Sequence, residues 1–195
     1  MTHPAILILA AGASSRMAPR DKLLELVGDE PLLRRQTRLA CETGCPTFVA
    51  LSPYRAKALE GLNYTPIVIE DPSQGMAASL RAGLAEARKI SPPALMILPG
   101  DMPDFTLPAL VAILDGWQET PNKILRGQAE NGQPGHPAIF PADLFDELAQ
   151  MQGDQGGRTV LQAHPDRIRL FPLPGAMAIT DLDTPEDWAA FRART

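Results

Sequence analysis

The chain of 195 residues is predicted to adopt an α/β fold with three layers, α/β/α, around a mostly parallel sheet. Short apolar runs of strand length alternate with stretches that repeat apolar residues at helical spacing, which is typical of βαβ units. Apolar residues make up 45% of the chain, enough to build a buried core. The prolines mark loops rather than one linker, so we expect a single domain over residues 1–195.

The first half of the chain alternates strands and helices regularly. Its first apolar run ends in a loop of small residues, and Gly44 closes the helix that begins at Leu32. The expected strands are Ala5–Ala10, Thr47–Leu51, Pro66–Ile69 and Ala94–Leu98, and the expected helices are Leu32–Cys41, Tyr54–Glu60, Gly75–Lys89 and Leu107–Trp117.

The second half is less regular. We interpret the polar, Gly- and Gln-rich stretch Gly127–Gly135 as a loop between two strands, and Gly153–Gly157 as a turn. Thr184 is a suitable N-cap for the closing helix. The expected strands here are Lys123–Arg126, Pro137–Phe140, Ile168–Pro172 and Ala176–Ile179, and the expected helices are Ala142–Gln150 and Pro185–Arg194.

Charge and composition exclude several classes of protein. The net charge of −5 argues against a nucleic-acid-binding surface. No apolar run approaches the length of a membrane span, and the N-terminus lacks the positive region of a signal peptide, so we expect a cytoplasmic location. Cys41 and Cys45 have no nearby pair of histidines, and we interpret them as thiols in a reducing compartment rather than metal ligands.

Residues 6–22, ILILAAGASSRMAPRDK, form the most informative stretch. The apolar run breaks at Gly12 into a loop of small residues, which then delivers Arg16, Arg20 and Lys22. A strand that ends in such a loop leaves backbone N–H groups pointing at one spot, where they can hold anionic oxygens. The cations suit a phosphate chain, so the stretch predicts a loop that binds a nucleoside triphosphate.

This loop matches neither of the two common phosphate-binding motifs. A Walker-type loop needs a second glycine followed by Lys and Ser or Thr, and the dinucleotide fingerprint needs three glycines at fixed spacing. The structural alternative is a strand-to-helix turn that carries surface cations.

Asp101 follows the strand Ala94–Leu98 just as Gly12 follows the first strand. Ligands of open parallel sheets bind outside the carboxyl ends of the strands, so both motifs belong to the same rim. A carboxylate beside a triphosphate would hold Mg²⁺. The alternative is a turn residue that caps the next helix, a role for which Asp104 is better placed.

Asp181 and Asp183 alternate around Leu182 in the segment TDLDTPEDW. On an extended backbone both carboxylates point to one face, and one of them would complete the metal site. The alternative is a helix N-terminus at which Glu186 and Asp187 favour the helix dipole.

Taken together, these motifs resemble those of nucleotidyltransferases with a sugar-nucleotide-transferase-like fold. LAAGASSRM followed by DKLLELVGDEPLL is similar to the family signature LAAGxSxRMG…K, PGDMP to its G-D-x-P motif, and TDLDTPEDW to its D-I-D-T-P-E-D element. The branch that it resembles most is that of the molybdenum cofactor cytidylyltransferases. Ala18 departs from the glycine of most members, which leaves the path from Met17 to Asp21 open.

The resemblance implies roles for individual residues. In it, Arg16 and the loop amides hold the β- and γ-phosphates, Lys22 stabilises the α-phosphate, and Asp101 holds Mg²⁺ with Asp183, chosen by its position in the motif. Gly75 and Ser79 belong to the nucleotide-base region, although a helix-start glycine and a helix-surface hydroxyl are equally good interpretations. The nucleotide-binding residues implied are Leu9, Ala10, Ala11, Gly12, Ser14, Arg16, Lys22, Gly75 and Ser79.

Two further segments, GQPGHPAIF and GDQGGRTVL, are similar to elements that face the second substrate in the molybdopterin branch. They imply that His136 and Arg158 bind the acceptor; the alternatives are a turn histidine and a surface arginine. Ala11 stands where guanylyltransferases commonly carry a second glycine, which favours the cytidylyl branch.

The expected reaction is transfer of CMP from CTP to a molybdopterin-type cofactor, with release of pyrophosphate and Mg²⁺ as the cofactor. The resemblance also implies a molybdoenzyme client as a partner. The alternatives are an enzyme of the same fold that uses GTP or acts on a sugar or alditol phosphate, and a non-catalytic nucleotide-binding protein that delivers the cofactor.

Overall fold

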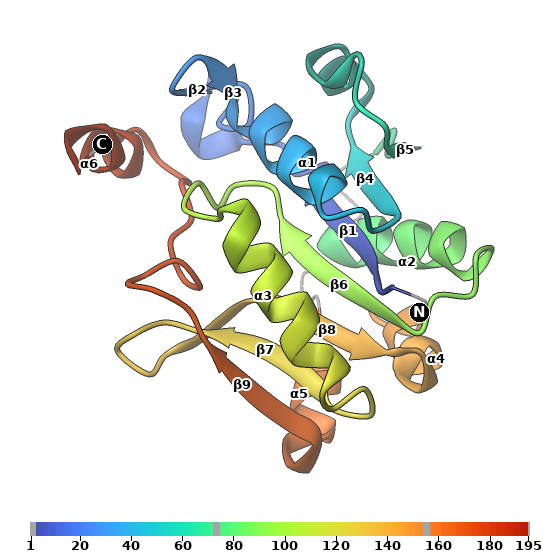
Figure 1. Ribbon diagram of the computed structural model, residues 1–195. Helices are drawn as coiled ribbons and strands as arrows, with labels where there is room; N and C mark the ends of the chain where they lie inside the picture. The colour runs from blue at the N-terminus through green and yellow to red at the C-terminus, as the bar shows by residue number, and fades with distance from the viewer. Residues whose placement is uncertain (1–2, 72–74, 154–156, 195) are drawn as a thin grey trace.

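A seven-stranded sheet forms the middle layer of the computed structural model, which describes residues 3–71, 75–153 and 157–194 (Figure 1). The strands follow the order β5-β4-β1-β6-β8-β7-β9. β8 runs antiparallel to both of its neighbours, and the other pairs are parallel. Their bounds are β1 Ala5–Ala10, β4 Thr47–Leu51, β5 Thr65–Val68, β6 Ala94–Pro99, β7 Ile124–Gln128, β8 Pro134–Pro141 and β9 Ile168–Pro172.

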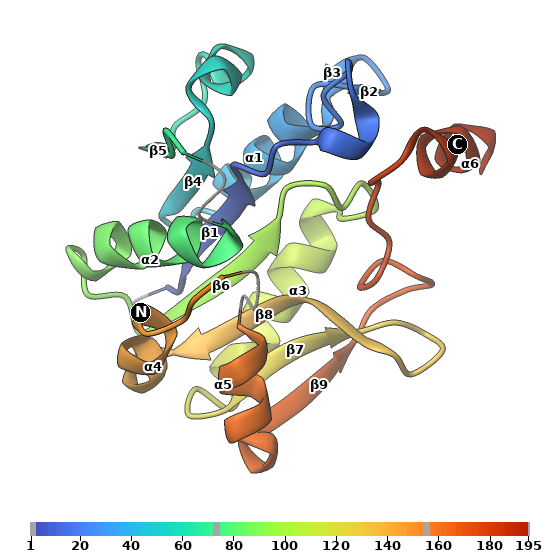
Figure 2. The same ribbon diagram turned by 180° about the vertical axis from the view of Figure 1, so that it is seen from behind.

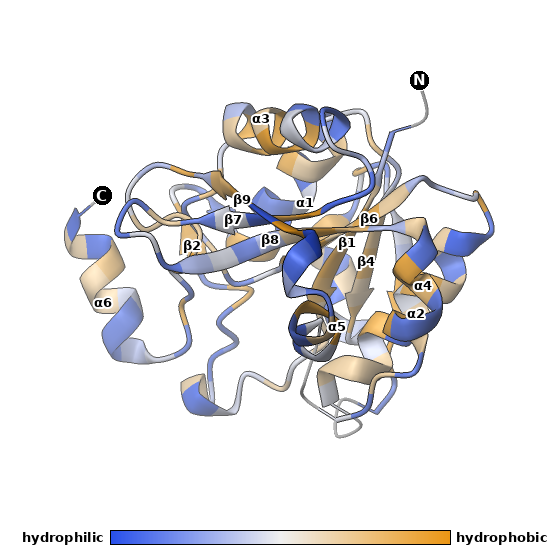
Figure 3. Cartoon of the chain, turned by 90° about the horizontal axis from the view of Figure 1, so that it is seen from below, coloured by the Kyte–Doolittle hydropathy of each residue, from blue (hydrophilic) through white to orange (hydrophobic). Residues whose placement is uncertain are grey.

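Helices cover both faces of the sheet, which confirms the predicted α/β/α fold (Figures 1 and 2). One face carries α1 and α3, and the opposite face carries α2, α4 and α5; Figure 3 shows α3 and α5 on either side of the strands. In the described residues, the helices are α1 Leu32–Glu42, α2 Gly75–Arg88, α3 Leu107–Gln118, α4 Phe145–Ala149, α5 Arg158–Ala163 and α6 Pro185–Arg194. The 3₁₀ segments there are Ser15–Met17, Pro53–Leu59, Ala142–Leu144 and Pro165–Arg167, and β2 Leu26–Val27 pairs with β3 Glu30–Pro31.

Alternation along the strands divides the apolar residues between two cores. In β1, Ile6 and Ile8 pack into the core beneath α1 and α3, whereas Ala5 and Leu7 pack into the core beneath α2 and α4. Because both faces of β1 are buried, the strand is apolar throughout. β1 lies between β4 and β6, so its carboxyl end lies inside the sheet edge and not at its margin.

A third, smaller core attaches the C-terminal helix α6 beside the loop that follows β1. Met17, from that loop, packs with Leu32, Leu182, Trp188 and Phe191. Two ion pairs reinforce the attachment, from Arg192 to Glu25 at 2.6 Å and from Arg194 to Asp104 at 2.8 Å. The segment that carries Asp181 and Asp183 is therefore fixed at its C-terminal end.

The start of α6 confirms the predicted N-cap. The Thr184 Oγ1 accepts a hydrogen bond from the Asp187 N–H at 3.2 Å, and the Asp187 carboxylate accepts one from the Thr184 N–H at 2.8 Å. This reciprocal pair satisfies backbone donors that the helix leaves open. At α3, by contrast, the cap is Thr106 and not Asp104, since its side chain accepts from the Ala109 N–H.

One of the expected elements is wrong, and another differs in length. Ala176–Ile179 is a turn and not a strand, because the N–H groups of Ile179 and Thr180 both donate back to the Ala176 carbonyl. The expected loop Gly127–Gly135 does join two strands, but it is shorter than predicted: β7 extends to Gln128 and β8 begins at Pro134, so residues 129–133 form the connection, with a bulge between Arg126 and Gln128.

Smaller differences concern helix type and length. The helix expected at Tyr54–Glu60 is the 3₁₀ segment Pro53–Leu59, and Ala142–Gln150 divides into a 3₁₀ turn and α4. The turn expected at Gly153–Gly157 includes residues 154–156, which lie outside the described residues. Among the helices that the structure describes, none combines the length and the apolar character that a membrane crossing requires.

Gly135 permits a close backbone contact that positions the turn 176–179. The His136 N–H donates to the Ala178 carbonyl at 2.7 Å, and a Cβ on Gly135 would collide with that same carbonyl oxygen. Only glycine leaves room for this approach. The turn is thereby fixed against β8 at Ala178, which lies five residues before Asp183.

We expect Gly135→Ala to lower the free energy of unfolding by about 1–3 kcal/mol, because backbone must move to admit the methyl group. Gly12→Ala is the matched control, since a Cβ at Gly12 would meet nothing within 4 Å. Chemical denaturation of both variants measures the difference. Equal stability of the two would contradict the proposed close contact.

Candidate active site

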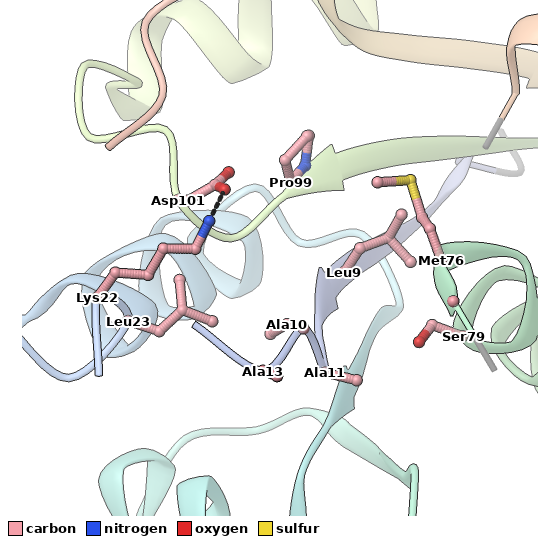
Figure 4. Close-up of a pocket in the computed structure, with 12 residues that line it drawn as sticks. Leu9, Ala10, Ala11, Ala13, Lys22, Leu23, Met76, Ser79, Pro99 and Asp101 are labelled. Carbon is pink, nitrogen blue, oxygen red and sulfur yellow. Dashed lines mark hydrogen bonds and ion pairs between the residues drawn. The ribbon is translucent and has the colours of Figure 1, made fainter. Parts of the chain in front are cut away.

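The carboxyl ends of β1 and β6 lie side by side and border a cavity of about 310 Å³. The Gly100 N–H donates to the Leu9 carbonyl at 3.0 Å and holds the two strand ends together. Figure 4 shows the cavity between the loop after β1, the Asp101 turn and α2. It is lined by Leu9, Ala10, Ala11, Gly12, Ala13, Lys22, Leu23, Gly75, Met76, Ser79, Pro99 and Asp101.

A fully buried guanidinium, that of Arg55, supports the loop from behind. It donates to the Ala10 carbonyl at 2.5 Å and to the Gly12 carbonyl at 2.8 Å, and it forms an ion pair with Asp21 at 2.7 Å. Ser52 Oγ donates to the carbonyl of Ala11, which lies between these two residues, at 3.3 Å. The carbonyl oxygens of the loop therefore face the protein interior.

Within the described residues, the N–H groups of Gly12 and Ala13 donate to no other group. With the neighbouring carbonyls held inside, these N–H groups are available to a ligand; that the ligand is anionic stays a prediction. Ser14 takes a left-handed conformation with φ of 54°, and its Oγ accepts from the Lys22 N–H at 2.8 Å. Ala18 lies at φ −50° and ψ 138°, which any residue adopts, so the glycine of most family members is not required there.

Lys22 connects the loop to two aspartates. Its ammonium lies 2.5 Å from both Asp101 and Asp183, and Arg16 pairs with Asp183 at 2.7 Å. Burial alone would lower the pKa of Lys22, but the two carboxylates outweigh it and raise that pKa above its ordinary value. Four of the residues singled out in the sequence thus form one charged cluster, whereas Arg20 pairs with Glu25 instead.

Asp101, Asp181 and Asp183 bring carboxylate oxygens within 4.8 Å of one another. Burial and the two neighbouring carboxylates raise the pKa of Asp181. The Leu182 N–H donates to the Asp101 carbonyl at 3.1 Å, which fixes the two acidic segments side by side. Hard divalent cations prefer such oxygen ligands, so this set fits Mg²⁺ or Mn²⁺. Asp181 belongs to the cluster as well as Asp183, the residue chosen from the sequence.

On the opposite wall, α2 presents Gly75 and Ser79. Gly75 has φ of 76°, a conformation that favours glycine, and Ser79 is buried. Ala11 is also buried and lies on the loop side of the same cavity (Figure 4). The structure therefore places both residues of the expected base region, Gly75 and Ser79, at the same cavity as Ala11.

A second cavity, of about 690 Å³, adjoins the first and shares Leu9, Met76 and Pro99 with it. His136 and Arg158, both singled out in the sequence, line this second cavity. Burial, and secondarily Arg126, lower the pKa of His136, and its Nδ1 is buried without a hydrogen-bond partner in the described part of the chain. The remaining lining residues are Leu80, Ile97, Arg126, Pro134, Gly135, Ala138, Phe140, Gly157, Leu161, Gln162 and Ile168.

Two residues in or beside the site, Arg55 and Arg126, escaped the sequence analysis. Arg55 lies in a short helix, where an arginine is usually a surface residue. Arg126 lies within a strand and belongs to no motif. Asp181 was weighed beside Asp183, and only the fold shows that both carboxylates reach Asp101.

Comparison with known proteins identifies the family. The profile described as the MobA-like NTP transferase domain matches residues 6–168. The chain belongs to this family. Among curated relatives, a molybdenum cofactor guanylyltransferase from Pseudomonas aeruginosa is 31% identical over 188 residues, which cover 93% of this chain and 90% of that protein.

Solved structures show the same architecture as this MobA-like chain. The crystal structure of Rv0371c from Mycobacterium tuberculosis has a TM-score of 0.83 at 27% identity and covers 97% of this chain and 98% of that one. A second structure of Rv0371c, described as a complex with manganese, has a TM-score of 0.80 at 24% identity and covers 100% of both chains. The MobA-like fold therefore extends over the whole described chain, and family membership makes the protein a nucleotidyltransferase.

We expect Asp101→Asn to weaken Mn²⁺ binding by at least about tenfold, because a neutral amide is a poorer ligand for a hard cation than a carboxylate. Titration calorimetry of the purified protein measures the affinity. Asp104→Asn is the matched control, since Asp104 pairs with Arg194 and lies outside the carboxylate cluster. Unchanged Mn²⁺ affinity in Asp101→Asn would mean that other residues hold the metal.

Proposed function

We propose that this protein transfers a CMP group from CTP to a molybdopterin-type acceptor that carries a terminal phosphate, and releases pyrophosphate. The observation that carries the proposal is the pair of adjoining cavities with shared walls at Leu9, Met76 and Pro99. One cavity is bordered by the anion-binding loop and the charged cluster, and the other offers cations and apolar walls. Such a pair suits two substrates that react where their sites meet.

The reaction needs positioning more than covalent chemistry from the protein. An oxygen of the acceptor phosphate attacks the α-phosphorus of the nucleotide, a new P–O bond forms, and the bond from the α-phosphorus to the pyrophosphate oxygen breaks. The acceptor oxygen is already negatively charged, so no general base is required. The protein contributes by holding both phosphates in line and by neutralising charge.

In this proposal, Arg16 and the amides after Gly12 hold the β- and γ-phosphates, while Lys22 stabilises charge on the α-phosphate. Ser14 contributes by holding the backbone of Lys22. Asp101 and Asp183, with Asp181, would hold Mg²⁺, which neutralises phosphate charge when bound. His136 and Arg158 face the acceptor from the second cavity.

The choice of base is supported by Ala11. Its methyl group stands on the loop side of the cavity, opposite Ser79 on α2, and narrows the gap in which the base would lie (Figure 4). A pyrimidine is smaller than a purine, so this wall favours CTP. The specific alternative is GTP. The observation that supports this alternative is the similarity to a relative named as a guanylyltransferase.

An assay of pyrophosphate release tests the reaction. The protein is incubated with Mg²⁺, molybdopterin and each nucleoside triphosphate in turn. Release with CTP is expected. Release only with GTP would overturn the choice of CTP, and no release with any nucleoside triphosphate would overturn the proposal in favour of a transferase for another acceptor, such as a sugar or alditol phosphate, or of a delivery protein. A molybdoenzyme client and a cytoplasmic location stay predictions.

Lys22→Ala should lower turnover by about 10²-fold, because its ammonium serves charge that develops in the transition state. Lys57→Ala is the control, since Lys57 lies outside the residues that line either cavity. Steady-state kinetics, with a thermal melt of each variant, gives the result. A normal turnover number combined with a lower melting temperature would show that Lys22 is only structural.

Ala11→Gly should relax the discrimination between bases. We expect at least about a tenfold preference for CTP over GTP in kcat/KM for the wild type, and a smaller ratio in the variant, since a modest change of bulk is worth about 1–3 kcal/mol. Ala13→Gly is the control, because it adds a glycine to the same loop. Equal use of CTP and GTP by the wild type would refute the cytidylyl assignment.

A further inference from the structure

We propose that Arg126 binds the acceptor's phosphate in the second cavity. Its guanidinium is already oriented by the protein, and no carboxylate of the described residues neutralises its charge. The inference rests on the proposed function and deepens it, since it names the group that selects a phosphate monoester as the acceptor. The acceptor class is a heterocycle that carries this phosphate.

The guanidinium of Arg126 is held from one side only. Nε donates to the Gly135 carbonyl at 3.0 Å, and one terminal nitrogen donates to the Pro134 carbonyl at 3.3 Å. A guanidinium has five N–H donors, so three of them are left over. No carboxylate of the described residues forms an ion pair with it.

The charge of the cavity points to an anionic ligand. Its lining includes the two arginines Arg126 and Arg158, and no aspartate or glutamate from the described chain. A fixed cation that is partly withdrawn from water and lacks a counter-ion costs free energy, and an anionic ligand removes that cost. A planar fork of N–H donors matches the oxygens of a phosphate.

The remaining walls suit a flat ring. Phe140, Leu161 and Ile168 line the cavity together with Leu80 and Ile97. The buried Nδ1 of His136 has no partner among the described residues and offers a hydrogen bond to a polar edge of such a ring. Apolar walls with a few polar groups are typical of sites for small heterocyclic ligands.

Arg126 is better suited to this role than Arg158. Arg158 is exposed at the start of α5, so it has to give up side-chain freedom on binding. Arg126 is half-buried on β7, its guanidinium is fixed by two carbonyls, and burial lowers its pKa without removing its charge. The same hairpin carries His136, whose N–H binds the turn that leads to Asp181 and Asp183.

Arg126→Met tests the charge, and Arg126→Lys restores it without the planar fork. We expect Arg126→Met to raise the KM for molybdopterin about 10- to 100-fold, the range for a lost hydrogen bond to a charged group, and to change the KM for CTP less than about twofold. Arg126→Lys should recover part of the loss. Arg169→Met is the matched control, because Arg169 lies on the adjacent strand β9 and pairs with Glu119 outside the cavity.

Equilibrium dialysis of molybdopterin against each nucleotide-free protein gives a readout that does not depend on turnover. Weaker retention by Arg126→Met than by the wild type and Arg169→Met supports the proposal. Equal retention by all three proteins overturns it, as does a loss in Arg126→Lys equal to that in Arg126→Met. Failure of the wild type to release pyrophosphate would overturn the proposed function, while the dialysis result still decides the role of Arg126.

Discussion

The buried guanidinium of Arg55 is the interaction on which the nucleotide side of the site depends. It binds the carbonyls of Ala10 and Gly12 and pairs with Asp21, so one side chain fixes both ends of the loop after β1. A buried arginine is tolerated only when its charge and its donors are satisfied, and here two carbonyls and a carboxylate satisfy them. Because the loop carbonyls are held inside, the loop N–H groups face the cavity. The orientation of the loop thus depends on a residue outside the motif.

The acidic side of the site depends on a segment fixed at three places. Ala178 accepts from the His136 N–H, Leu182 donates to the Asp101 carbonyl, and Trp188 packs in the small core with Met17. Asp181 lies directly before the anchor at Leu182, and Asp183 lies directly after it. Their carboxylates are therefore held close to that of Asp101, despite a separation of about eighty residues in sequence. The same core joins the acidic segment to the loop that follows β1.

The sequence predicted the features that local patterns encode and missed those that depend on tertiary contacts. The strands β1 and β6, the loop at Gly12 and the aspartate after β6 follow from apolar runs and small residues, so their common rim was predictable. The strand expected at Ala176–Ile179 was wrong because a short apolar run does not reveal that its backbone folds back on itself. Arg55 and Arg126 gave no signal, since only the fold determines which carbonyls and cavities they face. The roles of individual site residues stay predictions.

The two cavities differ in the balance of charge, and this difference bears on the order in which ligands enter. On the nucleotide side, Lys22 and Arg16 already face the three carboxylates of Asp101, Asp181 and Asp183. A triphosphate that approaches this cluster alone would meet carboxylates that its own charge repels, so a divalent cation has to enter with it or before it. The acceptor cavity has cations and no carboxylate among its described lining, and it needs no metal to attract a phosphate. If the proposed assignment of the two cavities holds, the cavity that contains Arg126 and Arg158 would bind its phosphate without a metal, whereas the cavity beside Asp101 would need one.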